Sequence, residues 1–158
     1  MPEIRKAYRL DASTYLFRLA TESVRLFSNR EGQFATISQV VESRAGVAKD
    51  IPANYEPNEL KKHLGIIPTD GEIPIILEIL PTAGDDVEQA IPAISRALSE
   101  SISFANAISI MLFDYVVEEN KTEVLTKLGL TVAEAREYSC LLRVRNDNVV
   151  PIGGQPGN

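Results

Sequence analysis

The apolar segment in the second half of the chain constrains the fold more than any other feature. From Val87 to Glu119 apolar residues recur at helical spacing, and over residues 102–117 they surround a helix on nearly every side. Such a helix needs apolar cover all round, which places it at the centre of a fold or in a contact between subunits. We therefore expect a long apolar helix over residues 86–119, with shorter helices packed around it.

The cover for this helix can come from the same chain or from a second protein, and the sequence leaves both open. The 158 residues, of which 44% are hydrophobic and 24% charged, suffice for one globular domain with a real core. A protein partner, or a second copy in a homo-oligomer, would contact one stripe of the helix. The members of this predicted partner-binding stripe are Phe104, Ile108, Met111, Leu112 and Tyr115.

The remaining segments predict a mainly α fold, a helical bundle with a minor β-hairpin or short strands in the first half at most. Apolar residues spaced by three and four favour a helix over residues 12–28, and Gly46 favours the end of a second helix over 34–45. Residues 28–33 also suit the turn of a β-hairpin. We prefer the helices but leave open whether residues 12–41 form a hairpin, which would make α+β the alternative class.

Prolines and glycines divide the middle of the chain. Residues 50–57 are predicted to be an irregular loop, and Pro57 is predicted to open a short helix that Gly65 ends. Residues 73–80 suit a buried strand or an extended connector. Pro74 argues against a central position in a sheet, because it lacks the N–H that a central strand must donate.

Residues that favour the start of a helix occur at both ends of the long helix. Residues 81–86 are predicted to be a loop in which Asp85 or Asp86 caps the helix that follows. After the long helix, Thr122 is expected to cap a separate short helix that ends at Gly129.

The stretch LTKLGLTVAEAREY, residues 125–138, has a residue pattern typical of a helix-turn-helix. Gly129 makes the turn, and Thr131 with Glu134 forms a capping box for the second helix. The part VLTKLGLTVAEA resembles the helix pair of ribbon-helix-helix antitoxins, a resemblance that implies DNA binding. A DNA-reading helix needs Arg, Lys, Asn or Gln at its start, whereas Glu134 and Glu137 stand there. We interpret the stretch as a capped helical hairpin that packs on the long helix.

The charge of the chain is unevenly distributed. The net charge is -6, and residues 1–50 carry eight Lys and Arg against six Asp and Glu, whereas residues 51–100 carry three against nine. The acidic middle repels phosphate, so only the N-terminal segment, a short strand or a basic arm with Arg5, Lys6 and Arg9, could hold nucleic acid. A small DNA-binding regulator or antitoxin-like protein that uses this arm is the alternative function.

Residues for catalysis or metal binding are scarce. The chain has one histidine, His63, and one cysteine, Cys140. His63 near the end of a predicted helix suits a cation that the helix dipole stabilises, and Cys140 lies among apolar residues, where thiols are inert. We expect no metal, no cofactor and no catalytic residue. A small-ligand binder or an enzyme built on dispersed carboxylates is the second alternative.

Organisation and location follow from the same composition. We expect a single globular domain over residues 1–145 and a flexible Gly/Pro-rich tail over residues 146–158. The N-terminal segment lacks the apolar core of a secretory signal, and the longest apolar run is shorter than the ~20 residues of a membrane span. The sequence thus predicts a cytoplasmic, acidic, non-enzymatic interaction or assembly protein that acts through an apolar helical surface and is homo-oligomeric.

Overall fold

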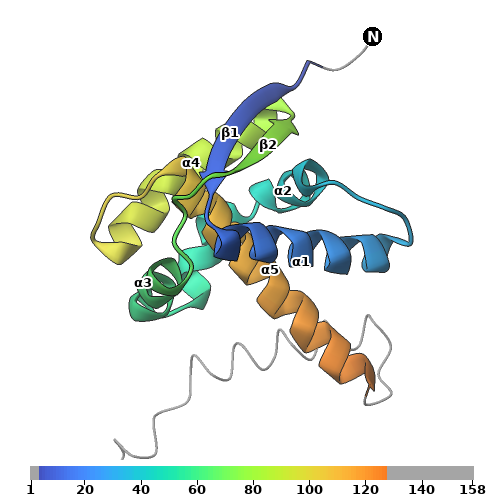
Figure 1. Ribbon diagram of the computed structural model, residues 1–158. Helices are drawn as coiled ribbons and strands as arrows, with labels where there is room; N and C mark the ends of the chain where they lie inside the picture. Colours follow the sequence, from blue (N-terminus) through green and yellow to red (C-terminus); the bar gives the residue numbers. More distant parts are fainter. Residues whose placement is uncertain (1–3, 128–158) are drawn as a thin grey trace, which may run out of the picture. The chain divides into compact units, whose positions relative to one another are not determined.

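A computed structural model of the chain describes residues 4–127, with side chains up to residue 121 (Figure 1). Its contacts divide the chain into two compact units, residues 1–116 and residues 117–158. The described part of the first unit is mainly helical and contains one two-stranded antiparallel sheet. The expected fold class, mainly α with minor β in the first half, is confirmed.

The sheet joins strand β1, Lys6–Ala12, to strand β2, Ile73–Ile79. Their alternating side chains place one face in the core, where Leu10 of β1 lies opposite Ile75 of β2. The N-terminal segment is thus a strand, and so is the segment that contains Pro74. A two-stranded sheet has no central strand, which is why it tolerates this proline.

The edge of β2 that faces away from β1 is bound by side chains of helix α2, Ile37–Ala45. The backbone N–H of Glu78 donates to the Ser38 hydroxyl over 2.9 Å, and the N–H of Leu80 donates to the Glu42 carboxylate over 2.8 Å. These bonds satisfy strand donors that no third strand reaches, and they fix α2 beside the sheet.

Residues 12–41 contain helices and no hairpin, as preferred from the sequence. Helix α1 spans Thr14–Glu31, and the Ser13 hydroxyl caps it by accepting the N–H of Leu16. Gly32 ends α1 in the left-handed region, with φ of 73°. The next helix, α2, then begins with a capping box between Thr36 and Gln39.

The predicted loop at residues 50–57 is wrong, because a 3-10 helix, η1, spans Ala48–Asn54. Pro52 lies inside it, and the φ of proline, near -65°, is compatible with 3-10 geometry. Pro57 opens helix α3, Pro57–Ile66, as predicted. Gly65 does not end this helix, which continues for one more residue.

The long apolar helix predicted over residues 86–119 is two helices, α4, Pro81–Leu98, and α5, Phe104–Lys127. Ser99 ends α4 in the left-handed region, with φ of 57°. Ser103 and Asn106 then bond each other's backbone N–H over 3.0 Å each, which caps the start of α5. Apolar periodicity runs through both helices and therefore concealed this polar break.

The predicted loop at residues 81–86 is also helical. Pro81 occupies the first turn of α4, where its missing N–H costs nothing, so neither Asp85 nor Asp86 is the cap. Gly84 lies in this turn against β1, and a Cβ there would stand 2.4 Å from the hydroxyl oxygen of Tyr8. A side chain at this position would therefore require the Tyr8 ring to move.

At its other end, α5 runs past Thr122, so the separate helix expected from that residue is wrong. The helix crosses from the first unit into the second without a break. The remainder of the helix-turn-helix stretch, Cys140 and the tail over 146–158 lie outside the described residues. The domain limits at residue 145 stay a prediction.

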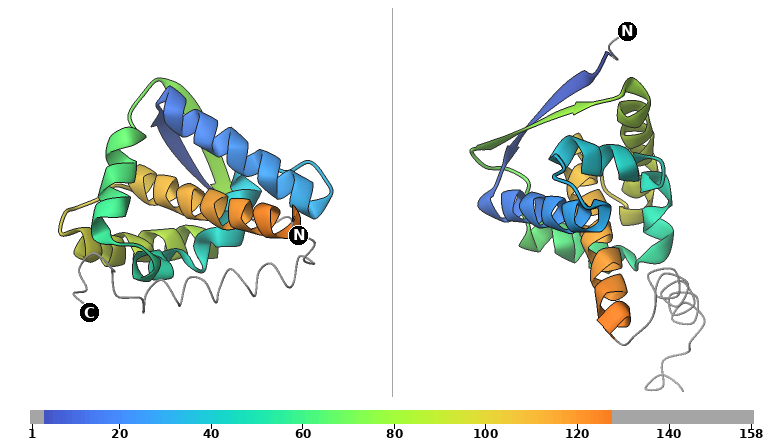
Figure 2. Two further views of the ribbon diagram at one scale, coloured as in Figure 1. Left: turned by 90° about the horizontal axis from the view of Figure 1, so that it is seen from below. Right: turned by 90° about the vertical axis from the view of Figure 1, so that its right-hand side faces the viewer.

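The first half of α5 lies at the centre of the first unit, between α1 and α4 (Figure 2). Its aromatic side chains contact three other elements. Phe104 stacks on Tyr8 of β1 with ring centroids 4.3 Å apart, and Tyr115 meets Phe27 of α1 at 6.2 Å. Phe113 stacks on His63 of α3 at 4.4 Å. The chain's own elements therefore supply cover for this helix.

Candidate interaction surface

The predicted partner-binding stripe on α5 lies within the core of the chain. Four of its members are at most 1% exposed, namely Ile108, Met111, Leu112 and Tyr115. Phe104 is partly buried by its stack on Tyr8. A role of these five residues in partner binding stays a prediction. In the single chain, a partner would reach the four buried ones only after neighbouring elements had moved.

The same helix buries a charged group that is bonded on both sides. Asp114 is 2% exposed, and its carboxylate accepts from Arg44 of α2 and from the Tyr55 hydroxyl, each over 2.8 Å. Two charge-assisted bonds compensate for the desolvation of this carboxylate. The bonds link α2, the end of η1 and α5, so the arrangement serves the fold and leaves no carboxylate oxygen open for a ligand.

His63 is part of the core and not a cation at a helix end. It is 6% exposed, and its Nε2 lies 2.8 Å from the Ser109 hydroxyl of α5. Burial lowers the pKa of His63, and the bond to Ser109 opposes this shift only in part. The expectation of a dipole-stabilised cation is wrong, because the ring is buried against α5, where Phe113 stacks on it with centroids 4.4 Å apart.

The cations of the N-terminal segment stand beside carboxylates. Arg5 pairs with Glu42 of α2, Lys6 with Glu88 of α4 at 3.4 Å, and Arg9 with Asp11 of the same strand at 3.0 Å. Strand β1 is also held in the sheet and is not a mobile arm. These pairs reduce the positive potential that a phosphate backbone would need.

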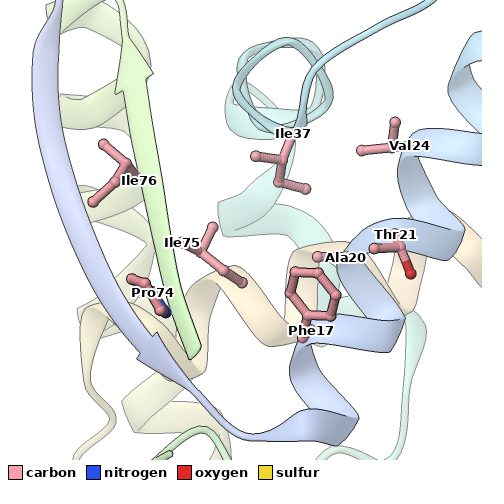
Figure 3. A pocket seen from close by; sticks show the side chains of 8 residues that line it. All are labelled: Phe17, Ala20, Thr21, Val24, Ile37, Pro74, Ile75 and Ile76. Atoms are coloured by element: carbon pink, nitrogen blue, oxygen red, sulfur yellow. The ribbon is translucent and has the colours of Figure 1, made fainter. Parts of the chain in front are cut away.

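An apolar groove opens between α1 and β2 (Figure 3). It has a volume of about 340 Å³, and none of the side chains from residue 4 to 121 fills it. Phe17 from α1, Ile75 from β2 and Ile37 from α2 point into it from three sides. The full lining comprises Phe17, Ala20, Thr21, Val24, Ile37, Pro74, Ile75 and Ile76.

The groove exposes large apolar side chains at its rim. Phe17 is 39% exposed and Ile76 is 47% exposed, on two elements far apart in the sequence. The α1 lining residues recur every three or four positions, so they form one helix face, in which Ala20 is buried whereas Phe17 and Thr21 are exposed. The sequence predicted α1 but not the groove, because periodicity cannot tell which apolar positions β2 covers only in part.

A second exposed apolar group lies beside the groove, in the loop between α1 and α2. Phe34 is 101% exposed, although it is one of only five phenylalanines. The loop reaches outwards at the right of Figure 1. It is nevertheless fixed, since the N–H groups of Gly32 and Ala35 both donate to Ser28, over 2.9 and 3.0 Å.

A second, more polar hollow of about 450 Å³ borders β1, α4 and the start of α5. Its principal charged groups already have partners, since Glu88 accepts from Tyr8 and Asp11 pairs with Arg9. Among the described residues, no group of three or more His, Cys, Asp or Glu side chains could hold a metal ion.

The chain matches no model of a known protein family, no curated protein and no solved structure. Each helix among residues 4–127 is too short or too polar for a bilayer crossing. The function must therefore be argued from the described surfaces, and among them the apolar groove joins an unfilled hollow to exposed apolar side chains.

Proposed function

We propose that the protein is a non-enzymatic interaction protein that self-associates through the apolar groove between α1, α2 and β2. The observation that carries this proposal is the exposure of Phe17 and Ile76 at the rim of an unfilled apolar hollow. Exposed apolar side chains that gather around a hollow mark contact sites, because their burial by a partner releases water from apolar surface.

The charged sites support this choice over the two alternatives. A DNA-binding regulator would use the cations of β1, which stand beside carboxylates of the same chain. A site of dispersed carboxylates would use Asp114, whose oxygens are bonded to Arg44 and Tyr55. A single cysteine fits a reducing compartment, and the cytoplasm is the proposed location.

The test is the mass of the full chain in solution over a range of concentrations. We expect a mass above that of the 17.4 kDa monomer, by light scattering or sedimentation. The variant Thr21→Arg places a long charged side chain at the groove rim, at an exposed position that the fold does not need. It should shift the population to monomer.

The matched control is Ile66→Ser. Ile66 is 61% exposed on α3, which contributes no residue to the groove. This variant should keep the mass of the wild type. A wild-type chain that stays monomeric at all concentrations, or a Thr21→Arg chain that associates as well as the wild type, would exclude the groove as the contact.

A further inference from the structure

We infer that the group that fills the groove is Phe34 of a second copy, in a reciprocal exchange that closes a dimer. The inference rests on the proposed function and adds the occupant and the symmetry. It joins two apolar features that the single chain leaves open, a protruding aromatic ring and a hollow beside it.

Phe34 is a fixed projection. Its side chain is fully exposed, while the backbone on both sides is bonded. Gly32 and Ala35 donate to Ser28, and Thr36 opens α2 with a capping box. A side chain on a fixed loop loses little conformational freedom on binding, so a larger part of the gain from its burial is retained.

The groove suits a phenyl ring in size and chemistry. Its volume of about 340 Å³ lies in the range of sites that enclose small apolar groups. Phe17 at the rim offers a ring that an incoming ring can approach edge to face, and Ile37 and Ile75 offer aliphatic contact. The only hydroxyl in the lining, that of Thr21, already donates to the Arg18 carbonyl.

The charges beside the two surfaces are few and nearly balanced. Residues 14–45, which carry the loop and both helices beside it, contain four arginines and three glutamates, and Arg44 among them is bound to buried Asp114. Strand β2, the other wall of the groove, has Glu78 as its only charged residue, and it is exposed. In a chain with a total charge of -6, two such surfaces repel each other less than more acidic parts would.

The symmetry follows from the position of the projection. Phe34 precedes Ile37, a groove residue, by only three positions, so the chain between projection and hollow is short. Two copies related by a twofold axis can insert both rings at once, which closes the assembly at two. One-way insertion would leave a projection and a hollow open at the ends and would produce a growing filament.

The experiment compares Phe34→Ser with Thr21→Arg and with the control Ile66→Ser, all as full chains. We expect a wild-type dimer, and loss of the ring should raise the dissociation constant by about thirtyfold or more. Mixed in equal amounts, the Phe34→Ser and Thr21→Arg chains should form a heterodimer by native mass spectrometry. The Phe34→Ser chain keeps an open groove and the Thr21→Arg chain keeps its Phe34 ring, so one of the two ring insertions can still form.

Other results separate this inference from the proposed function. A Phe34→Ser chain that dimerises like the wild type, beside a monomeric Thr21→Arg chain, would overturn the inference and leave the groove as the contact surface. Assemblies that grow beyond two would overturn the reciprocal exchange. A wild-type monomer would overturn both proposals. If Thr21→Arg fails to fold, Phe17→Ser replaces it, with urea unfolding as the check for both.

Discussion

Polar side chains are buried around the centre of α5, whereas apolar side chains are exposed at the groove beside α1. Around α5, Asp114 and His63 are buried, but each has a bonded partner within the chain. At the groove, Phe17 and Ile76 are covered only in part and stay 39% and 47% exposed. Buried polar groups and exposed apolar groups therefore have different roles. Internally satisfied polar groups specify the fold, whereas uncovered apolar groups mark a surface for another molecule.

The largest effect should come from Asp114→Ala. It leaves the Arg44 guanidinium and the Tyr55 hydroxyl in a largely buried site without their acceptor, and we expect a loss of about 3 kcal/mol in the free energy of unfolding. Urea titration measures it. The exposed pair gives the control, since Asp11→Ala should cost at most about 1 kcal/mol. Equal losses would mean that Asp114 does not act as a buried anchor.

A smaller loss, about 2 kcal/mol, is expected for Gly71→Ala, which tests how the groove wall is positioned. A Cβ at Gly71 would lie 2.2 Å from the carbonyl oxygen of Ala12 and 2.5 Å from the Cα of Ser13, so the start of β2 must shift. In contrast, Gly65→Ala in α3 meets no atom within 4 Å and should stabilise the chain by up to about 1 kcal/mol. If both changes stabilise the chain, the backbone at Gly71 packs less closely against Ala12 and Ser13 than described.

The pH dependence of stability tests the neutral, buried state of His63. Burial lowers its folded-state pKa below the ordinary 6.5, so the unfolded chain binds the proton more readily. Stability is therefore complete above pH 6.5 and falls as the pH drops below it, by up to about 1.4 kcal/mol between pH 7.5 and 5.5.

Because His63 is the only histidine, His63→Gln removes this titration entirely. Urea unfolding of the variant at the same two pH values should show a smaller decline than that of the wild type, whatever its absolute stability. Parallel declines in the two chains would show that the imidazole keeps its ordinary pKa in the fold.

The smallest effect on folding, within about 0.5 kcal/mol, is expected for Thr21→Arg. Thr21 is exposed at the rim, and its hydroxyl bonds only the carbonyl of its own helix. Unlike Asp114→Ala, this groove variant should alter self-association and leave urea unfolding almost unchanged when both chains are compared at concentrations at which they are monomeric. A loss above 2 kcal/mol would identify Thr21 as part of the core.

The sequence predicted the first two helices from apolar periodicity and from one terminating glycine. Helices α1 and α2 were preferred over the hairpin, and Gly46 follows the last residue of α2 as predicted, whereas the roles of Gly32 and Thr36 at the helix ends were not predicted. The break between α4 and α5 was missed, because Ser103 and Asn106 cap a helix within a run whose apolar periodicity continues. A cap inside such a run is visible only as two polar residues three positions apart.

The surfaces were harder to predict than the elements, because they depend on contacts between distant segments. The sequence left open whether the chain itself or a partner covers the stripe on α5, and in the structure four of its five members are at most 1% exposed. Whether Phe17 is covered depends on β2, which begins at Ile73, more than fifty residues away. The spacing of apolar residues in α1 does not reveal how closely β2 packs against that helix.

The bonds from α2 to the edge of β2 also limit how copies of this chain can join. Ser38 occupies the N–H of Glu78, and Glu42 occupies that of Leu80 just after the strand, so α2 obstructs the addition of a strand on that side. Strand addition has no natural stopping point and leads towards fibrils, whereas a reciprocal insertion of two side chains closes at two copies. By obstructing this edge, α2 protects a chain with exposed apolar side chains against aggregation through β2.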